Sequence, residues 1–397
     1  MLFRSIRKTQ SAFLSTLLTL WLAIPGRINY ANLQRFSHLN EKTYRNWFAK
    51  PVPWVALNAS LVQTLQAQHR MGTTFILGID ASNNRKAGKH THGVAKFWDS
   101  KLDKAVSSLE ISCCTLIDLK YRQAIPIHAL QTPAELPEAE SRVTHYAEHL
   151  DKSYTTLPEA LQKQVKCAVG DAFYSKKSFV DSVVKTGLSF VGKLRTDANL
   201  RMLYEGPRSN KAGRPKRYAD KVDWNDLSAW TVELSDERCT IQSACVNSPS
   251  LKRDLRVVCI TWFVSEGKTR REVLFCTDVS MLAMEVIECY RARFEMEFPF
   301  RDGKQFAGLM DCQSRQKEAL EFHWNASFLV TSLTRAQQLL DFAGDMDDFV
   351  FSMEDSKRRA YNELFAERII RLLPLELSFE KYILLLEDAL NLGVKAA

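Results

Sequence analysis

The sequence predicts a mixed α/β fold, in which strands and helices alternate through the middle of a chain of 397 residues. Short apolar runs bounded by polar segments occur at 75–80 and 166–171, and such runs are typical of buried strands. Segments with helical spacing separate these runs. A third stretch, 199–280, is β-patterned, with a candidate hairpin turn at 265–268.

The order of these elements predicts one mixed sheet with helices on its faces. A strand is followed by two strands joined by a short turn, then by a helical crossover, and finally by a strand, a helix and a strand. The expected strands are 75–80, 109–119, 122–130, 166–171 and 188–194, and the expected helices are 138–150, 158–164 and 176–186.

The N-terminal segment, 1–70, is predicted to be helical. Apolar residues in 12–24 follow helical spacing and are interrupted by Ser and Thr, which favours an amphipathic core helix over a secretory signal. Helices at 30–36 and 41–48, separated by a polar turn, have the form of a helix-turn-helix. Many helical hairpins share this form. If it binds DNA, Arg45 and Asn46 are candidates to contact bases, and Lys42 to contact a phosphate.

Positive charge is unevenly distributed along a chain of net charge +8. Residues 1–50 hold eight Lys or Arg and one acid, and 193–217 hold eight Lys or Arg and two acids. Clustered cations favour a polyanionic partner, although a solvated basic face would be the default interpretation of the clusters taken alone. The nine cysteines form no Cys-x-x-Cys pair, which favours reduced core thiols over a zinc site.

Three carboxylates are the candidate catalytic residues. Asp80 and Asp171 are each predicted to end a buried strand. Glu297 belongs to the pattern Tyr290, Arg293, Glu297 and Lys304, whose side chains fall within an arc of about 60° on one continuous helix. A carboxylate between cations on one stripe is poorly explained as a core face. Pro299, however, removes a helical hydrogen-bond donor, and a kink there would move Lys304 off the stripe.

This four-residue pattern resembles the Tyr-Arg-Glu-Lys signature of bacterial insertion-sequence transposases of the DDE type, the family named after insertion sequence four. Further similar blocks occur in the same order at 170–174, 194–200 and 322–327. The resemblance covers about 72–333, roughly two thirds of the chain.

The resemblance implies a ribonuclease H-like fold with a β-rich insertion at 199–280. It also implies that Asp80, Asp171 and Glu297 bind two Mg²⁺ ions, for which Mn²⁺ is expected to substitute, and that these ions cleave phosphodiester bonds. Tyr290, Arg293 and Lys304 would then bind DNA phosphates.

Three further residues are weaker candidates for DNA contacts. Arg214 and Lys216 belong to a Gly-Arg-Pro segment that either enters an AT-rich minor groove or is a plain basic linker. Trp262 is either a platform for an unstacked base or a core residue of its strand, and the core reading is favoured.

The sequence therefore predicts a helical DNA-binding domain at 1–70, a catalytic domain at 71–198 and 281–335 that is split by the insertion, and a C-terminal helical region at 336–397. The expected function is cleavage at terminal inverted repeats and transfer of 3′-OH ends to target DNA. Two alternatives are a ribonuclease H-like nuclease without strand transfer and a non-catalytic DNA-binding protein.

The remaining expectations concern partners and location. Double-stranded DNA is the expected partner, and a dimer is expected when both element ends are bound. Leucines of the C-terminal helices at 357–373 and 379–392 are candidates for the subunit interface: Leu372, Leu373, Leu384, Leu385 and Leu386. A cytoplasmic, nucleoid-associated protein without a membrane span is expected.

Overall fold

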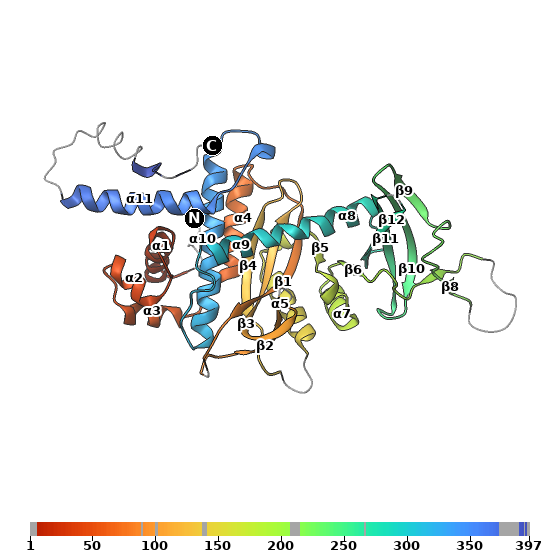
Figure 1. Ribbon diagram of the computed structural model, residues 1–397, viewed down its shortest axis with the longest axis horizontal. Coiled ribbons are helices and arrows are strands. Elements are labelled where there is room, and N and C mark those ends of the chain that lie inside the picture. Colours follow the sequence, from red (N-terminus) through yellow and green to blue (C-terminus); the bar gives the residue numbers. More distant parts are fainter. Residues whose placement is uncertain are drawn as a thin grey trace.

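The structure is a computed structural model that describes residues 6–88, 90–99, 102–136, 141–206, 215–265, 267–372, 389–392 and 394. Within this part of the chain, twelve strands form one mixed sheet that is flanked by helices (Figure 1). The predicted mixed α/β fold class is therefore confirmed.

The first half of the sheet contains the five strands that the alternating pattern predicted and one further strand, β2 (Ala95–Asp99). The five predicted strands are β1 (Phe75–Arg85), β3 (Lys104–Asp118), β4 (Ala124–Gln131), β5 (Val165–Val169) and β6 (Phe190–Leu194). β3 pairs antiparallel with β1, whereas β1, β5 and β6 run parallel to one another. β2 and β4 both pair with the outer edge of β3. This topology is compatible with a ribonuclease H-like fold.

The β-rich segment continues the same sheet. Its strands are β7 (Arg201–Leu203), β8 (Tyr218–Lys221), β9 (Thr231–Ser235), β10 (Cys239–Ser248), β11 (Arg253–Ser265) and β12 (Lys268–Cys276). β12 pairs antiparallel with β6, and this pairing joins the two halves edge to edge. In Figure 1 these strands lie to the right, away from most of the helices. The sequence did not predict β2, β7 or β8, which are short and only partly buried.

Helices cover both faces of the sheet because apolar side chains of β1 point alternately to each side. Phe75, Leu77 and Ile79 pack with one set of helices, and Ile76 packs on the opposite face. The first face is covered by α4 (Trp54–Ala67), α5 (Arg142–Thr155), α6 (Glu159–Gln162) and α7 (Lys177–Lys185). The second carries α8 (Ala283–Ala292), α9 (Glu297–Gln305) and α10 (Lys317–Asp341).

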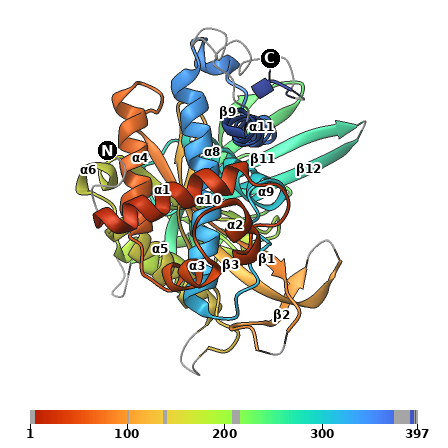
Figure 2. The ribbon, with the colours of Figure 1, turned by 90° about the vertical axis from the view of Figure 1, so that its left-hand side faces the viewer.

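The N-terminal helices share their core with α10. α1 (Lys8–Ala23), α2 (Tyr30–Phe36) and α3 (Glu41–Phe48) lie in front of α10 in Figure 2. Phe48 stacks on Phe322 of α10 with 4.2 Å between ring centroids, and Trp21 donates a 2.8 Å hydrogen bond to the carbonyl oxygen of Ala307. Asn40 caps α3 by accepting from the Thr43 N–H at 2.9 Å.

The C-terminal region is helical where the structure describes it. A 3₁₀ turn, η3 (Met346–Asp348), interrupts the acidic loop that precedes α11 (Met353–Leu372), and α11 contacts α1. Most of the helix predicted at 379–392 lies outside the described residues, as do Leu373, Leu384, Leu385 and Leu386 and the side chain of Leu372. No helix in the described part of the chain is long and apolar enough to cross a bilayer. All nine cysteines are free thiols, and all but Cys245 are buried.

We predict that Phe48→Ala destabilises the whole protein by about 3–5 kcal/mol, because it removes a buried ring from the core that α3 shares with α10. Urea denaturation followed by tryptophan fluorescence measures the change. Trp98→Ala, which truncates an aromatic side chain that is 60% exposed, is the control and should change stability by less than about 0.5 kcal/mol. Equal losses in the two variants would contradict the prediction.

Candidate active site

Asp80 and Asp171 lie at the same level on neighbouring parallel strands. Gly78 of β1 pairs with Val169 of β5, so the two aspartates, each two residues further along, continue that register on one face of the sheet. Asp171 follows the end of β5 as predicted. Asp80 does not end its strand, because β1 continues to Arg85 through antiparallel pairing with β3. The long β3 explains the difference, since it supplies hydrogen-bond partners beyond the last residue of β5.

Each aspartate uses one carboxylate oxygen in a local backbone hydrogen bond. The Asp80 carboxylate accepts from the Ala81 N–H at 2.9 Å. The Asp171 carboxylate accepts from the Phe173 N–H at 2.9 Å and so caps a 3₁₀ turn, η1 (Ala172–Tyr174). These bonds fix the direction of both side chains at the edge of the sheet and engage only one oxygen of each.

A glycine in the centre of β1 allows the third carboxylate to approach. A Cβ atom at Gly78 would lie 2.3 Å from the Met296 sulfur, so only the absence of a side chain lets Met296 pack on the strand. Glu297 is the next residue, and it is exposed at the start of α9. Gly78 was not among the site residues predicted from the sequence. The signal available was a glycine inside a strand, which often marks such a close approach.

The segment that carries Tyr290, Arg293, Glu297 and Lys304 is not one continuous helix. A 3₁₀ turn, η2 (Arg293–Met296), separates α8 from α9. Pro299 has no N–H, and in a continuous α-helix its ring would clash with the Glu295 carbonyl, which lies within this turn. The interruption does not move Lys304 away from the sheet. Its ammonium group donates to the Ser82 hydroxyl at 2.5 Å, and Ser82 is two residues beyond Asp80 on β1.

Arg293 and Tyr290 are buried beside the aspartates. The Arg293 guanidinium lies 5.6 Å from the Tyr290 ring centroid and 4.6 Å from that of Phe294, and the side chain is 7% exposed. Burial raises the pKa of the Tyr290 hydroxyl, and the neighbouring Arg293 charge opposes this shift. The buried Arg293 Nε has no hydrogen-bond partner among the described residues.

The electrostatics of Asp80 reflect its burial and its neighbours. The pKa of the Asp80 carboxyl is raised to about 6, first because burial removes solvent and second because the Asp171 charge lies nearby. Arg293 opposes both effects, whereas Glu297 adds a smaller increase. Asp171 and Glu297 therefore both lie within electrostatic range of Asp80. In the arrangement described, however, no three His, Cys, Asp or Glu side chains are close enough together to hold one metal ion.

The three residues of α3 that were predicted to contact DNA lie on the surface. Lys42, Arg45 and Asn46 are exposed on α3. Arg45 forms an ion pair with Glu41, and its guanidinium lies 4.9 Å from the Tyr30 ring centroid.

The two candidate sites in the β-rich segment have different environments. Lys216 is exposed, and its ammonium group lies 4.9 Å from the Tyr204 ring centroid, whereas Arg214 lies outside the described residues. Trp262 is half-buried on β11 and packs against the core between the sheet and α8, with the Arg291 guanidinium 5.8 Å from its ring. This environment fits the favoured interpretation of Trp262 as a core residue better than the alternative of an exposed platform for an unstacked base.

We predict that Gly78→Ala destabilises the protein by about 1–3 kcal/mol, because the new methyl group displaces Met296 and with it η2. Adding Met296→Ala should recover part of the loss, since it removes the atoms in conflict. The interaction energy from a double-mutant cycle in urea measures this recovery. Strictly additive effects of the two substitutions would contradict the proposed contact.

Comparison with known proteins assigns the family. No curated protein matches the chain. A family model described as "DDE superfamily endonuclease" matches residues 2–245, which is more than half of the chain. The match includes Asp80 and Asp171 and ends before Glu297. With two carboxylates on adjacent strands and a third in electrostatic range, the chain belongs to the DDE superfamily of endonucleases.

Proposed function

We propose that this chain is the transposase of an insertion sequence, related to the family named after insertion sequence four. It binds the terminal inverted repeats of its element, cleaves DNA at the element ends and transfers the 3′-OH ends to target DNA. The observation that carries the proposal is the grouping of Asp80, Asp171 and Glu297, with the buried cation Arg293, in a chain of the endonuclease superfamily.

Magnesium suits the proposed site because its donors are carboxylate oxygens, the ligands that this ion takes in proteins. Asp80 and Asp171 each engage one oxygen in a backbone hydrogen bond, and their other oxygens remain for a cation. Asp80, Asp171 and Glu297 would hold two Mg²⁺ ions. When bound, such a pair lowers the pKa of attacking water and stabilises the leaving oxygen.

The side chains around the carboxylates would hold the DNA strand during cleavage. Arg293 is fixed by its aromatic neighbours and carries a buried positive charge, which suits contact with a phosphate next to the scissile bond. The Tyr290 hydroxyl can donate to the same phosphate. Lys304, held over β1 at Ser82, would contact the backbone on the other side of Asp80.

Recognition of the terminal repeats is proposed for α2 and α3, whose exposed face carries Lys42, Arg45 and Asn46. Lys216, at the edge of the β-rich segment, would add a contact that is independent of DNA sequence. Binding to chromosomal DNA would make the protein nucleoid-associated.

Two alternative functions share parts of this evidence. A nuclease without strand transfer would use the same carboxylates, and joined DNA ends among the reaction products would exclude it. A non-catalytic DNA-binding protein would have no need of three carboxylates around a buried arginine. Cleavage of DNA fragments from the region flanking the chain's own coding sequence would exclude that alternative.

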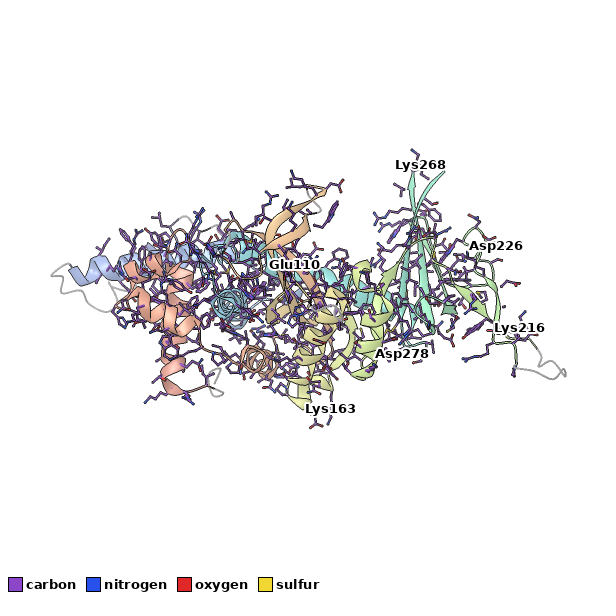
Figure 3. All side chains as sticks on the ribbon, turned by 90° about the horizontal axis from the view of Figure 1, so that it is seen from below. Glu110, Lys163, Lys216, Asp226, Lys268 and Asp278 are labelled. Atoms are coloured by element: carbon purple, nitrogen blue, oxygen red, sulfur yellow. The ribbon has the colours of Figure 1, made fainter. Side chains whose placement is uncertain are left out.

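We predict that Asp80→Ala, Asp171→Ala and Glu297→Ala each abolish cleavage and change DNA affinity little, because metal ligands act in the chemical step whereas cations dominate affinity. Cleavage of radiolabelled flanking fragments with Mg²⁺ and gel-shift titration of the same DNA measure the two effects. Asp226→Ala, which removes a carboxylate from the far end of the β-rich segment, is the control (Figure 3). Wild-type cleavage by any of the three variants would refute the assignment.

We predict a dimer in the complex that holds both element ends, because two ends must be cut in concert and each chain carries one site. An exposed stripe on α11, formed by Tyr361, Phe365 and Ile369, is the interface candidate in the described part of the C-terminal region. Light scattering of the paired-end complex measures its mass, and Phe365→Asp should lower the yield of that complex. A single protein chain bound to two ends would contradict the prediction.

A further inference from the structure

A hollow of about 920 Å³ lies between α3 and the connection from α9 to α10, apart from the carboxylates. Its wall contains residues from both regions, and none of them is acidic: Tyr30, Arg45, Asn46, Ala49, Lys50, Gln313, Ser314, Arg315, Gln316 and Ala319. Most of these side chains are polar or charged. The hollow therefore suits a hydrated, charged ligand better than an apolar one.

Three cations line the hollow, and they favour an anion. Arg45 is partly neutralised, because it is paired with Glu41. Lys50 and Arg315 are exposed, and neither takes part in an ion pair within the described residues. The Lys50 ammonium lies 3.8 Å from the Trp47 ring centroid, which fixes its position at the rim. The first turn of α10 also faces the hollow, and its N-cap residue Gln316 provides no side-chain cap.

The wall that carries Arg315 is attached to the strand of Asp80. Lys86, which directly follows β1, donates through its ammonium group to the Cys312 carbonyl oxygen. The Arg315 carbonyl oxygen accepts from the His92 N–H at 2.9 Å, and the His92 carbonyl oxygen accepts from the Gln131 side chain at 2.8 Å. These bonds tie the connection to β1 and β4, so the hollow has a defined position relative to Asp80.

The segment from Asp80 to Lys86, which contacts the connection that lines the hollow, gives the scale of the separation in base pairs. The six residues from Asp80 to Lys86 span on the order of 20 Å, at about 3.3 Å per residue. B-form DNA rises about 3.4 Å per base pair, so this length corresponds to roughly six base pairs.

We propose that this hollow binds the phosphate backbone of duplex DNA about six base pairs from the bond that is cut, with Lys50 and Arg315 as its principal cations. The proposal rests on the proposed function and extends it, because it assigns DNA contacts to the connection between α9 and α10. The backbone is then held jointly by α3 and by the catalytic part of the chain.

The test compares full-length Lys50→Ala/Arg315→Ala with the wild type. The probes are fluorescent 60-base-pair duplexes from the DNA flanking the chain's own coding sequence, and anisotropy is measured at several salt concentrations. Lys163→Ala/Lys185→Ala is the matched control, because it removes two exposed cations from helices on the other side of the sheet. Circular dichroism verifies that each variant is folded. Lys50→Arg/Arg315→Lys keeps both charges and should bind like the wild type.

Lys50→Ala/Arg315→Ala, the hollow variant, should bind the duplexes about tenfold more weakly than the wild type near 0.1 M salt. The negative slope of log K against log salt should become less steep by about two. The control should bind within about twofold of the wild type. Phosphate-ethylation interference should show contacts about six base pairs from the cut that disappear in the hollow variant. An unchanged affinity and slope in that variant, with specific binding by the wild type, would overturn this inference alone. A wild type that binds none of the duplexes would overturn the proposed function as well.

Discussion

The close approach of Met296 to Gly78 is the contact on which the candidate site depends. It brings a helical segment from late in the sequence against the centre of the first strand, and it leaves room for no side chain between them. Asp80 is two residues beyond Gly78, and Glu297 is one residue beyond Met296. The carboxylates from β1 and α9 are therefore positioned by the packing of the buried Met296 on the strand, where shape complementarity is strict.

Around this contact, burial and the neighbouring negative charges raise the pKa of Asp80, and the positive charge of Arg293 opposes them. Asp80 loses solvent and lies within range of two like charges, and both effects favour its protonated form. Arg293 provides the compensating charge within the protein, yet it is itself buried between aromatic rings. The resulting site therefore holds a buried carboxyl whose pKa is strongly perturbed by its neighbours. Such a perturbation is common where a protein binds ions or charged substrates.

The sequence was sufficient to predict elements whose signal is local. The bounds of α2 and α3 agree with the polar turn and the cap at Asn40, and the central strands agree with the apolar runs. Features that depend on contacts between segments distant in the sequence were not predicted in full. β1 extends past Asp80 because β3 is available as a partner. Pro299 indicated that the helix would be interrupted, but not that the interruption would be a 3₁₀ turn at 293–296 that packs on Gly78. The sharing of one core between α3 and α10 depends on contacts across more than 270 residues, which no local pattern encodes.

The shared core also constrains how this chain can change over evolutionary time. The inner face of α3, with Tyr44 and Phe48, is committed to packing against other helices, and only its outer face is free to vary. A DNA-reading module on a linker can be exchanged for an unrelated one by recombination between genes. Here such an exchange would expose the apolar side of α10. If α3 reads DNA as proposed above, new DNA preferences would have to arise by point substitutions on a fixed scaffold.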